Sequence, residues 1–219
     1  MKRMIFFPVL IFTLPGLNAQ NLQVHYDFGE GRHYFTSTLE RFAPDLLGST
    51  YFFIDFNYSE KGPTEAYWEI SRELKKWEAP FTVHIEYNGG LNALIPLQIN
   101  NAYLGGATYT WNAPDFSRGF SFSGLYKYIQ GNPSPHNFQL TGVWYVNFWK
   151  GRISLNGFFD FWREPQAFMA TEYVFLSEPQ WWINLNRSFS LGGEVEIGYN
   201  FAGVKGWNIC PTLGAKWTM

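Results

Sequence analysis

Apolar and polar side chains alternate with a period of two residues over most of this sequence. In residues 136–148 the apolar series includes Phe138, Leu140, Trp144 and Phe148, and the intervening positions are mostly polar. Successive side chains of a β-strand point to opposite faces, so the pattern is typical of strands with two chemically different faces. No segment shows a convincing helical period. An all-β fold is therefore predicted.

The alternating segments, separated by short breaks, predict twelve strands. Because twelve is an even number, an antiparallel up-and-down meander can close into a barrel with both termini at one end. Most segments reach or approach the roughly 9–11 residues that a tilted strand needs to cross a bilayer. The predicted strands cover residues 22–28, 33–42, 50–58, 64–73, 80–88, 99–111, 119–129, 136–148, 151–162, 171–184, 187–199 and 207–219.

Alternation alone does not tell which face of a barrel is inside. A soluble barrel has an apolar interior, and an outer-membrane barrel inverts this arrangement. Aromatic residues make up 21% of the chain, and several lie near strand ends, as Trp207 and Trp217 do, where a membrane interface would lie. The other face carries many carboxylates, which a dry core does not accommodate. We therefore expect a transmembrane β-barrel in the outer membrane, in contact with lipid.

The expected topology also agrees with this class. If the chain starts in the periplasm, the shortest predicted connections, 149–150 and 185–186, both lie on the periplasmic side, as is usual for outer-membrane barrels.

Composition argues against several other classes. Disordered chains are poor in aromatic residues, and a helical membrane protein needs about 18 consecutive apolar residues, which do not occur after the N-terminus. A formal net charge of −2 does not suit a nucleic-acid-binding protein. The single cysteine, Cys210, permits no internal disulfide, and the four histidines lie on different predicted strands or their edges. We predict no cofactor, no metal and no nucleic-acid partner.

Residues 1–19 have the layout of a secretory signal peptide. Lys2 and Arg3 precede an apolar run, residues 15–16 break the run, and the small Ala19 stands before the expected cleavage point. A buried N-terminal strand is the alternative. The predicted domains are a signal peptide, 1–19, and a barrel, 20–219. Removal of the signal lowers Lys plus Arg from 16 to 14 against 18 acidic residues, which makes the formal charge −4.

Four short strings are familiar together: LGSTYFFID at 47–55, AYWEI at 66–70, HIEYNGG at 84–90 and LSEPQ at 176–180. With them, the chain after the signal peptide resembles a Gram-negative outer-membrane family related to the Tsx-like, nucleoside-specific channel-forming proteins. The resemblance implies a monomeric twelve-stranded barrel whose narrow lumen passes nucleosides. The resemblance implies the architecture and the transport class for this chain. It does not identify substrate-contacting residues.

The last strand resembles the terminal signal strand of outer-membrane proteins through Thr212, Gly214, Trp217 and Met219. It departs from that pattern at Met219, where an aromatic residue is usual. The resemblance implies recognition of this strand by the barrel-assembly machinery, and an ordinary final strand is the alternative.

A twelve-stranded barrel is intermediate between filled small barrels and open porins, so a narrow polar lumen is expected. An acidic lining disfavours anions. Aromatic rings beside hydrogen-bonding groups suit an uncharged base carrying a sugar, although the rings could equally serve only to fill the barrel. The predicted substrate-contacting or lumen-lining residues are Phe53, Asp55, Glu65, Tyr67, Glu69, His84, Glu86, Lys127, Tyr145, Asp160, Trp162, Glu178, Gln180, Glu194 and Glu196. The alternation also places His25, Asp27, Tyr51, Arg152, Phe158, Glu172, Trp182 and Lys216 on this face.

Enzymatic activity is not predicted. His25 with Asp27, and His84 with Glu86, share strand faces and could act as acid–base pairs, but no nucleophile is evident near them in the sequence. A channel for passive uptake of small hydrophilic solutes, with nucleosides favoured, is the predicted function. A structural or adhesive barrel without a pore is the alternative.

The connection predicted at 89–98 is unusually apolar for a surface loop, with Leu91, Leu94, Ile95 and Leu97. We expect it either to fold inward and cap the pore or to contact lipid or a partner.

Overall fold

The alternating segments form β-strands over nearly the whole described chain. A computed structural model of the protein describes residues 19–93 and 98–219. The predicted signal peptide, except for Ala19, lies outside the described residues, so its cleavage stays a prediction. One short 3-10 helix, Trp149–Gly151, lies between two of the strands. Within the described residues, no helix has the length and the apolar character needed to cross a membrane.

The strand bounds agree closely with the predicted ones. The elements are β1 (Ala19–Asp27), β2 (Phe35–Asp45), β3 (Gly48–Ser59), β4 (Gly62–Leu74), β5 (Phe81–Asn92), β6 (Gln98–Asn112), β7 (Arg118–Ile129), β8 (His136–Phe148), β9 (Ile153–Gln166), β10 (Thr171–Ser177), β11 (Gln180–Asn184), β12 (Phe189–Tyr199) and β13 (Trp207–Thr218).

The elements β10 and β11 together make one strand of the barrel wall. Both pair with β9 on one side and with β12 on the other. Pro179 has no N–H to donate, which interrupts the hydrogen-bond ladder between them. The amide of Glu178 still donates to the Phe158 carbonyl at 3.1 Å, and Val195 donates to the Pro179 carbonyl at 3.0 Å. Thirteen elements therefore form the twelve strands that the sequence predicts, including the single segment 171–184.

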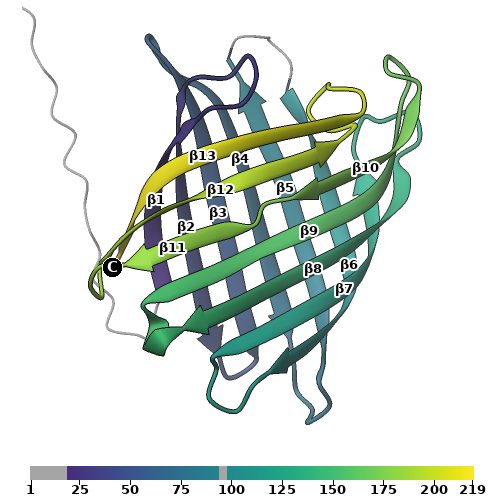
Figure 1. Cartoon of the computed structure of the whole chain (residues 1–219). Helices are drawn as coiled ribbons and strands as arrows, with labels where there is room; N and C mark the ends of the chain where they lie inside the picture. The colour runs from purple at the N-terminus through teal and green to yellow at the C-terminus, as the bar shows by residue number, and fades with distance from the viewer. Residues whose placement is uncertain (1–18, 94–97) are drawn as a thin grey trace, which may run out of the picture.

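The strands follow one another around a closed antiparallel meander (Figure 1). Each strand pairs with its neighbours in the chain, and β13 closes the barrel by pairing with both β12 and β1. Both ends of the described chain, Ala19 and Met219, lie at the same end of the barrel, where Met219 donates to the Gln20 carbonyl at 2.9 Å. We call this end the terminal end and the opposite one the distal end.

The turns at the terminal end are short. Residues 46–47, 75–80, 113–117, 149–152 and 185–188 connect strands there. The connections at 149–152 and 185–188 thus lie at the end that the sequence predicts. The distal turns include the longer 28–34 and 200–206, but also the short turn 60–61.

Polar side chains point into the barrel and apolar side chains point out. On β1 the inward His25 and Asp27 are 1% and 2% exposed, whereas Phe35 and Trp207 on the outer face of neighbouring strands are 56% and 66% exposed. A water-soluble barrel has the reverse arrangement. An outer surface rich in exposed Phe, Trp, Leu and Ile requires an apolar solvent, so the barrel spans a membrane with lipid against this surface.

One predicted boundary is wrong. The loop expected at 89–98 is shorter, because Gly89–Asn92 continues β5 and pairs with β4 and β6. Gly90 permits this extension, since a Cβ atom there would lie 2.6 Å from Ile99 Cδ1 and 2.7 Å from the Ala66 carbonyl oxygen. Residues 94–97 lie outside the described part of the chain, so the capping role of this loop stays a prediction.

The interruption at Pro179 depends on a glycine on the neighbouring strand. A Cβ atom on Gly157 would lie 2.6 Å from the Glu178 carbonyl oxygen and 2.9 Å from Pro179 Cα. We expect Gly157→Val to force the two strands apart and to lower the free energy of unfolding by about 2 kcal/mol. Urea unfolding of the refolded barrel in detergent, followed by Trp fluorescence, measures this change.

Gly124→Val is the matched control, because a Cβ atom there meets no other atom within 4 Å. Equal unfolding midpoints for the two variants would show that the close approach at Gly157 does not matter.

Candidate functional site in the barrel lumen

The register of the strands brings six carboxylates into electrostatic contact inside the barrel. Glu178 interacts with Glu194, Asp55 and Glu69, and Glu69 in turn interacts with Glu86 and Asp160. Glu194 also interacts with Asp55. We call this set the carboxylate ring: Asp55, Glu69, Glu86, Asp160, Glu178 and Glu194.

The members of the carboxylate ring come from opposite walls. Asp55 lies on β3 and Glu178 at the break between β10 and β11, which is on the far side of the twelve-stranded wall. Carboxylates from these distant strands therefore interact with one another across the interior of the barrel. A narrow passage ringed by carboxylates favours cations and neutral solutes over anions.

Lys127 is the cation closest to one half of the ring. Its ammonium group donates to Gln139 Oε1 at 2.7 Å and lies 4.4 Å from the centre of the Trp162 ring. Gln139 in turn donates to Asp160 Oδ1 at 3.2 Å, and Lys127 interacts electrostatically with Glu69. Lys127 is 8% exposed, so its charge offsets part of the ring without closing it.

His84 lies between two carboxylates in the wall. Its Nδ1 lies 2.6 Å from Glu73 Oε1 and its Nε2 lies 3.0 Å from Glu86 Oε2. Thr108 Oγ1 lies 3.4 Å from Nδ1 and hydrogen-bonds to Ser123 Oγ at 2.8 Å. Sequence reasoning did not foresee these hydroxyl groups. Since both ring nitrogens are engaged by carboxylates, neither is placed to take a proton from Thr108, which favours a structural role for the network.

His25 belongs to a densely packed sector of the wall. Its ring hydrogen-bonds with Thr212 Oγ1 at 2.8 Å and with Gln23 Oε1 at 3.1 Å, and it packs edge-on against Trp182 at 5.6 Å. Trp182 is fully buried, and the ammonium group of Lys216 lies 4.2 Å from the centre of its ring. Side chains therefore fill part of the cross-section along β1, β11 and β13.

Arg32 reaches into the distal end of the lumen from the turn 28–34. Its guanidinium donates to both carboxylate oxygens of Glu196, at 2.6 and 3.0 Å, and to Asp27 at 3.1 Å. Burial lowers the pKa of Arg32, but the hydrogen bond and the charge of Glu196 raise it, and the net shift is upward. Sequence reasoning placed Glu196 in the lumen and missed Arg32, because a loop residue has no alternation to reveal it.

The aromatic rings of β3 and β4 form a ladder on the inner face. Phe53 lies 6.1 Å from both Tyr51 and Tyr67, measured between ring centres. Tyr67 donates to Glu69 Oε1 at 2.7 Å. This ladder brings flat apolar faces next to the carboxylate ring.

The remaining predicted residues lie around these groups. Gln180 donates to Glu194 at 3.0 Å, and Glu65 accepts from Asn57 at 3.1 Å. Tyr145 lies farther toward the terminal end, where it donates to Asn112 at 2.8 Å. The inner face also carries Phe158.

Two further expectations are wrong. Arg152 lies in the exposed turn after the 3-10 helix and not on a strand facing the lumen. Glu172 lies at a β-bulge near the distal end of β10 and is exposed, because the register shifts between Thr171 and Tyr173. A pattern continued past the end of a strand misassigns Arg152, and an undetected bulge misassigns Glu172.

An apolar cluster on the inner face was also missed. Ala102 and Leu104 of β6 pack with Leu125 and Ile129 of β7, and all four are at most 5% exposed. These four residues share the inward parity of Lys127 on β7 and of its partner positions on β6. This apolar section of the inner face adjoins the carboxylate ring, because Leu104 is the cross-strand partner of Glu86.

Metal binding is not indicated by the geometry. In residues 19–93 and 98–219, no three His, Cys, Asp or Glu side chains converge as a metal site requires.

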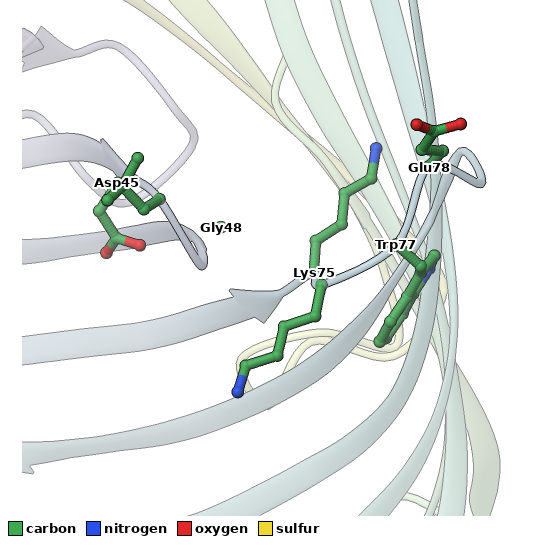
Figure 2. Close-up of a pocket in the computed structure, with 7 residues that line it drawn as sticks. Asp45, Gly48, Lys75, Trp77 and Glu78 are labelled. Carbon is green, nitrogen blue, oxygen red and sulfur yellow. The ribbon is translucent and has the colours of Figure 1, made fainter.

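Two cavities lie at the terminal end. One, of about 580 Å³, is lined by side chains of β9, β11, β12 and β13 and by the turns 149–152 and 185–188. The other, of about 570 Å³, lies between the turns 46–47 and 75–80, where Asp45, Lys75, Trp77 and Glu78 surround it (Figure 2).

Comparison with known proteins supports the fold. A family model described as "Domain of unknown function (DUF5020)" matches residues 19–219. A search of curated protein sequences gave no match.

Three solved barrels are similar in structure. A NanC porin has a TM-score of 0.62 at 11% identity, over 92% of this chain and 100% of that one. A KdgM porin in complex with disordered oligogalacturonate has a TM-score of 0.56 at 10% identity, over 92% and 99%. The COG4313 outer membrane channel from Pseudomonas putida F1 has a TM-score of 0.51 at 10% identity, over 98% and 100%. The predicted fold, a closed twelve-stranded antiparallel barrel of the outer-membrane type, is confirmed.

The ion pairs of Arg32 hold the distal turn 28–34 against the barrel wall. We expect Glu196→Gln to weaken this attachment by about 1 kcal/mol, because the bidentate ion pair becomes a single hydrogen bond from the guanidinium to an uncharged amide oxygen. Amide hydrogen exchange in residues 28–34 should then be roughly fivefold faster. Glu60→Gln in the exposed turn 60–61 is the control, and equal exchange in the two variants would contradict the role of Glu196.

Proposed function

The chain belongs to the family described as Domain of unknown function (DUF5020), and from the chemistry of its lumen we propose that it is an outer-membrane channel for passive uptake of small hydrophilic solutes, with nucleosides as the favoured substrates. The observation that carries this proposal is the carboxylate ring next to the aromatic ladder of Tyr51, Phe53 and Tyr67.

The carboxylate ring supports passage of neutral or positively charged solutes. Rings of Asp and Glu side chains select against anions in membrane pores. Among the similar barrels, the KdgM porin was solved with oligogalacturonate. The ring of six carboxylates in this chain makes a polyanion of that kind an unfavourable solute. We therefore favour uncharged substrates.

The aromatic ladder supports nucleosides among uncharged solutes. A flat base can stack on Phe53 or Tyr67, and each stacked base contributes about 1–3 kcal/mol. The hydroxyl groups of a ribose can donate to Glu69 and Asp55, which are the cross-strand partners of Phe53 and Tyr67, respectively. The substrate roles of the residues predicted from sequence belong to this proposal.

The proposal includes the route to the membrane. The signal peptide 1–19 directs export, and β13, with Trp217 and Met219 at its end, is the strand that the barrel-assembly machinery recognises. The terminal end faces the periplasm, in agreement with its short turns, and the barrel works as a monomer without enzymatic activity.

A pore-less structural or adhesive barrel is the second candidate. It is favoured by the buried sector along β1, β11 and β13, where Gln23, His25 and Trp182 are at most 1% exposed. A refolded barrel that passes no current in planar bilayers would establish this function in place of the channel.

Ion selectivity tests the carboxylate ring. We expect the wild-type channel to conduct K⁺ better than Cl⁻ in planar bilayers under a salt gradient. The variant Glu69→Gln/Glu178→Gln should reduce the permeability ratio at least about twofold, because two ring charges are lost inside a narrow lumen. Glu30→Gln/Glu60→Gln removes two exposed charges from distal turns, where salt screens them, and should leave the ratio nearly unchanged. Similar ratios for both double variants would contradict a selective ring.

Block of the current by adenosine tests the substrate class. Adenosine added to one side should lower the conductance in a saturable way, and Phe53→Leu should raise the half-blocking concentration about fivefold because one stacking face is lost. Phe52→Leu is the matched control, since Phe52 lies next to Phe53 on the outer face. A conducting channel that adenosine does not block would overturn the nucleoside assignment and leave the channel itself standing.

A further inference from the structure

The cavity of about 580 Å³ at the terminal end lies against the inner face of the barrel wall. Its floor consists of inward-facing residues near the terminal ends of four strands: Ser154, Asn184, Ser190 and Lys216. Asn184 donates to Ser154 Oγ at 3.0 Å and accepts from Ser190 Oγ at 2.6 Å. The floor is thus a preformed polar surface. We call this cavity the terminal cavity.

Three further cations form the rim of the terminal cavity. Lys150 and Arg152 come from the turn 149–152, and Arg187 comes from the turn 185–188. With Lys216 in the floor, four cationic side chains line the cavity, and no Asp or Glu lines it.

In contrast to two arginines elsewhere in the described chain, these four cations have no carboxylate partner. Arg32 pairs with Glu196 and Asp27, and Arg72 pairs with Asp45 at 2.6 Å. In residues 19–93 and 98–219, none of Lys150, Arg152, Arg187 and Lys216 makes an ion pair with a carboxylate. Lys216 rests on the Trp182 ring and interacts with Glu40 only at longer range. Lys150, Arg152 and Arg187 lie in exposed turns, and together with the half-buried Lys216 they make the terminal cavity electropositive.

We propose that the terminal cavity binds a small oxyanion of two or more charges, of the phosphate or polycarboxylate type. Guanidinium groups such as those of Arg152 and Arg187 match the paired oxygens of carboxylate and phosphate. The donor hydrogens of Asn184 and Ser190 are already used within the floor, so the guanidinium and ammonium groups supply the hydrogen bonds to the ligand. A cavity of this volume falls within the range of small-molecule sites, about 300–1,000 Å³.

The ligand enters from the terminal side and goes no farther. The carboxylate ring repels an anion that has passed the cavity, so the bound oxyanion stays at the mouth of the lumen. The neighbouring cavity provides a contrast. It also holds two lysines, Lys75 and Lys76, but Asp45 and Glu78 line it with them (Figure 2). Asp45 is paired with Arg72, and Glu78 offsets one of the two lysines, so the net positive charge is smaller than in the terminal cavity and we expect no oxyanion site.

Equilibrium binding of pyrophosphate to the refolded full barrel tests the site without depending on conductance. Titration calorimetry in phosphatidylcholine nanodiscs at about 0.1 M salt, where the Debye length is about 10 Å, limits binding by exposed charges. We expect one pyrophosphate per barrel in the wild type. Arg152→Gln/Arg187→Gln should weaken binding at least about tenfold, and Lys75→Gln/Lys76→Gln should bind like the wild type.

A second arm distinguishes a soluble oxyanion from a lipid headgroup. The same titration is repeated in nanodiscs that contain phosphatidylglycerol. Unchanged affinity for pyrophosphate supports a soluble ligand. If phosphatidylglycerol instead competes with pyrophosphate, and the competition disappears in Arg152→Gln/Arg187→Gln, the same oxyanion site binds a lipid headgroup. Absence of binding in wild-type phosphatidylcholine nanodiscs, or equal weakening by both double variants, would overturn the proposal. Trp fluorescence and heat-dependent gel mobility confirm that each variant has folded.

Discussion

Closure of the sheet through the pairing of β1 with β13 is the constraint on which the rest of the structure depends. A bilayer offers no water to the backbone N–H and C=O groups of an open edge, so a strand-built protein can cross it only as a closed barrel. Closure separates the lipid outside the barrel, which favours apolar side chains, from the interior, which accommodates polar ones. Outward positions are selected for contact with hydrocarbon, and inward positions can keep polar groups such as those of His25 and Asp27 away from lipid. The alternation of the chain follows from this separation.

The strands, and the side of the sheet to which each side chain points, could be predicted from sequence because the polarity of each residue indicates its side. Asp55, Glu69, Glu86 and Glu194 were placed inside by alternation alone. The method fails where alternation ends. Arg32 and Arg152 lie in turns, Glu172 lies at a bulge, and Gly89–Asn92 looks like a turn in sequence but continues β5. Contacts across the lumen, such as that between Glu178 and Asp55, join strands far apart in the sheet, so no local pattern can reveal them.

The charges of the lumen are sorted along its axis as well as around it. The middle carries the carboxylate ring with Lys127 as a partial counter-charge, and the terminal cavity carries four cations without carboxylates. In the wall, polar groups are satisfied mainly by one another, as in the network of His84, Glu73 and Thr108. Such networks hold inward side chains in fixed positions. The lumen is therefore a rigid surface whose electrostatic character changes from one end to the other.

The interruption between β10 and β11 also affects how this wall can deform. Leu176, Glu178 and Gln180 all face inward. The gap between β10 and β11 has two residues, so the alternation of inward and outward side chains continues unchanged from one element to the next. Only a few main-chain hydrogen bonds connect the wall around Pro179. Gly157 of β9, which has no side chain, lies against the Glu178 carbonyl and Pro179. A bend of the wall at this height would move the Glu178 carboxylate toward or away from the axis while the seam between β1 and β13 stays intact. The width of the pore at the carboxylate ring is therefore linked to a segment of the wall where the hydrogen-bond ladder is interrupted.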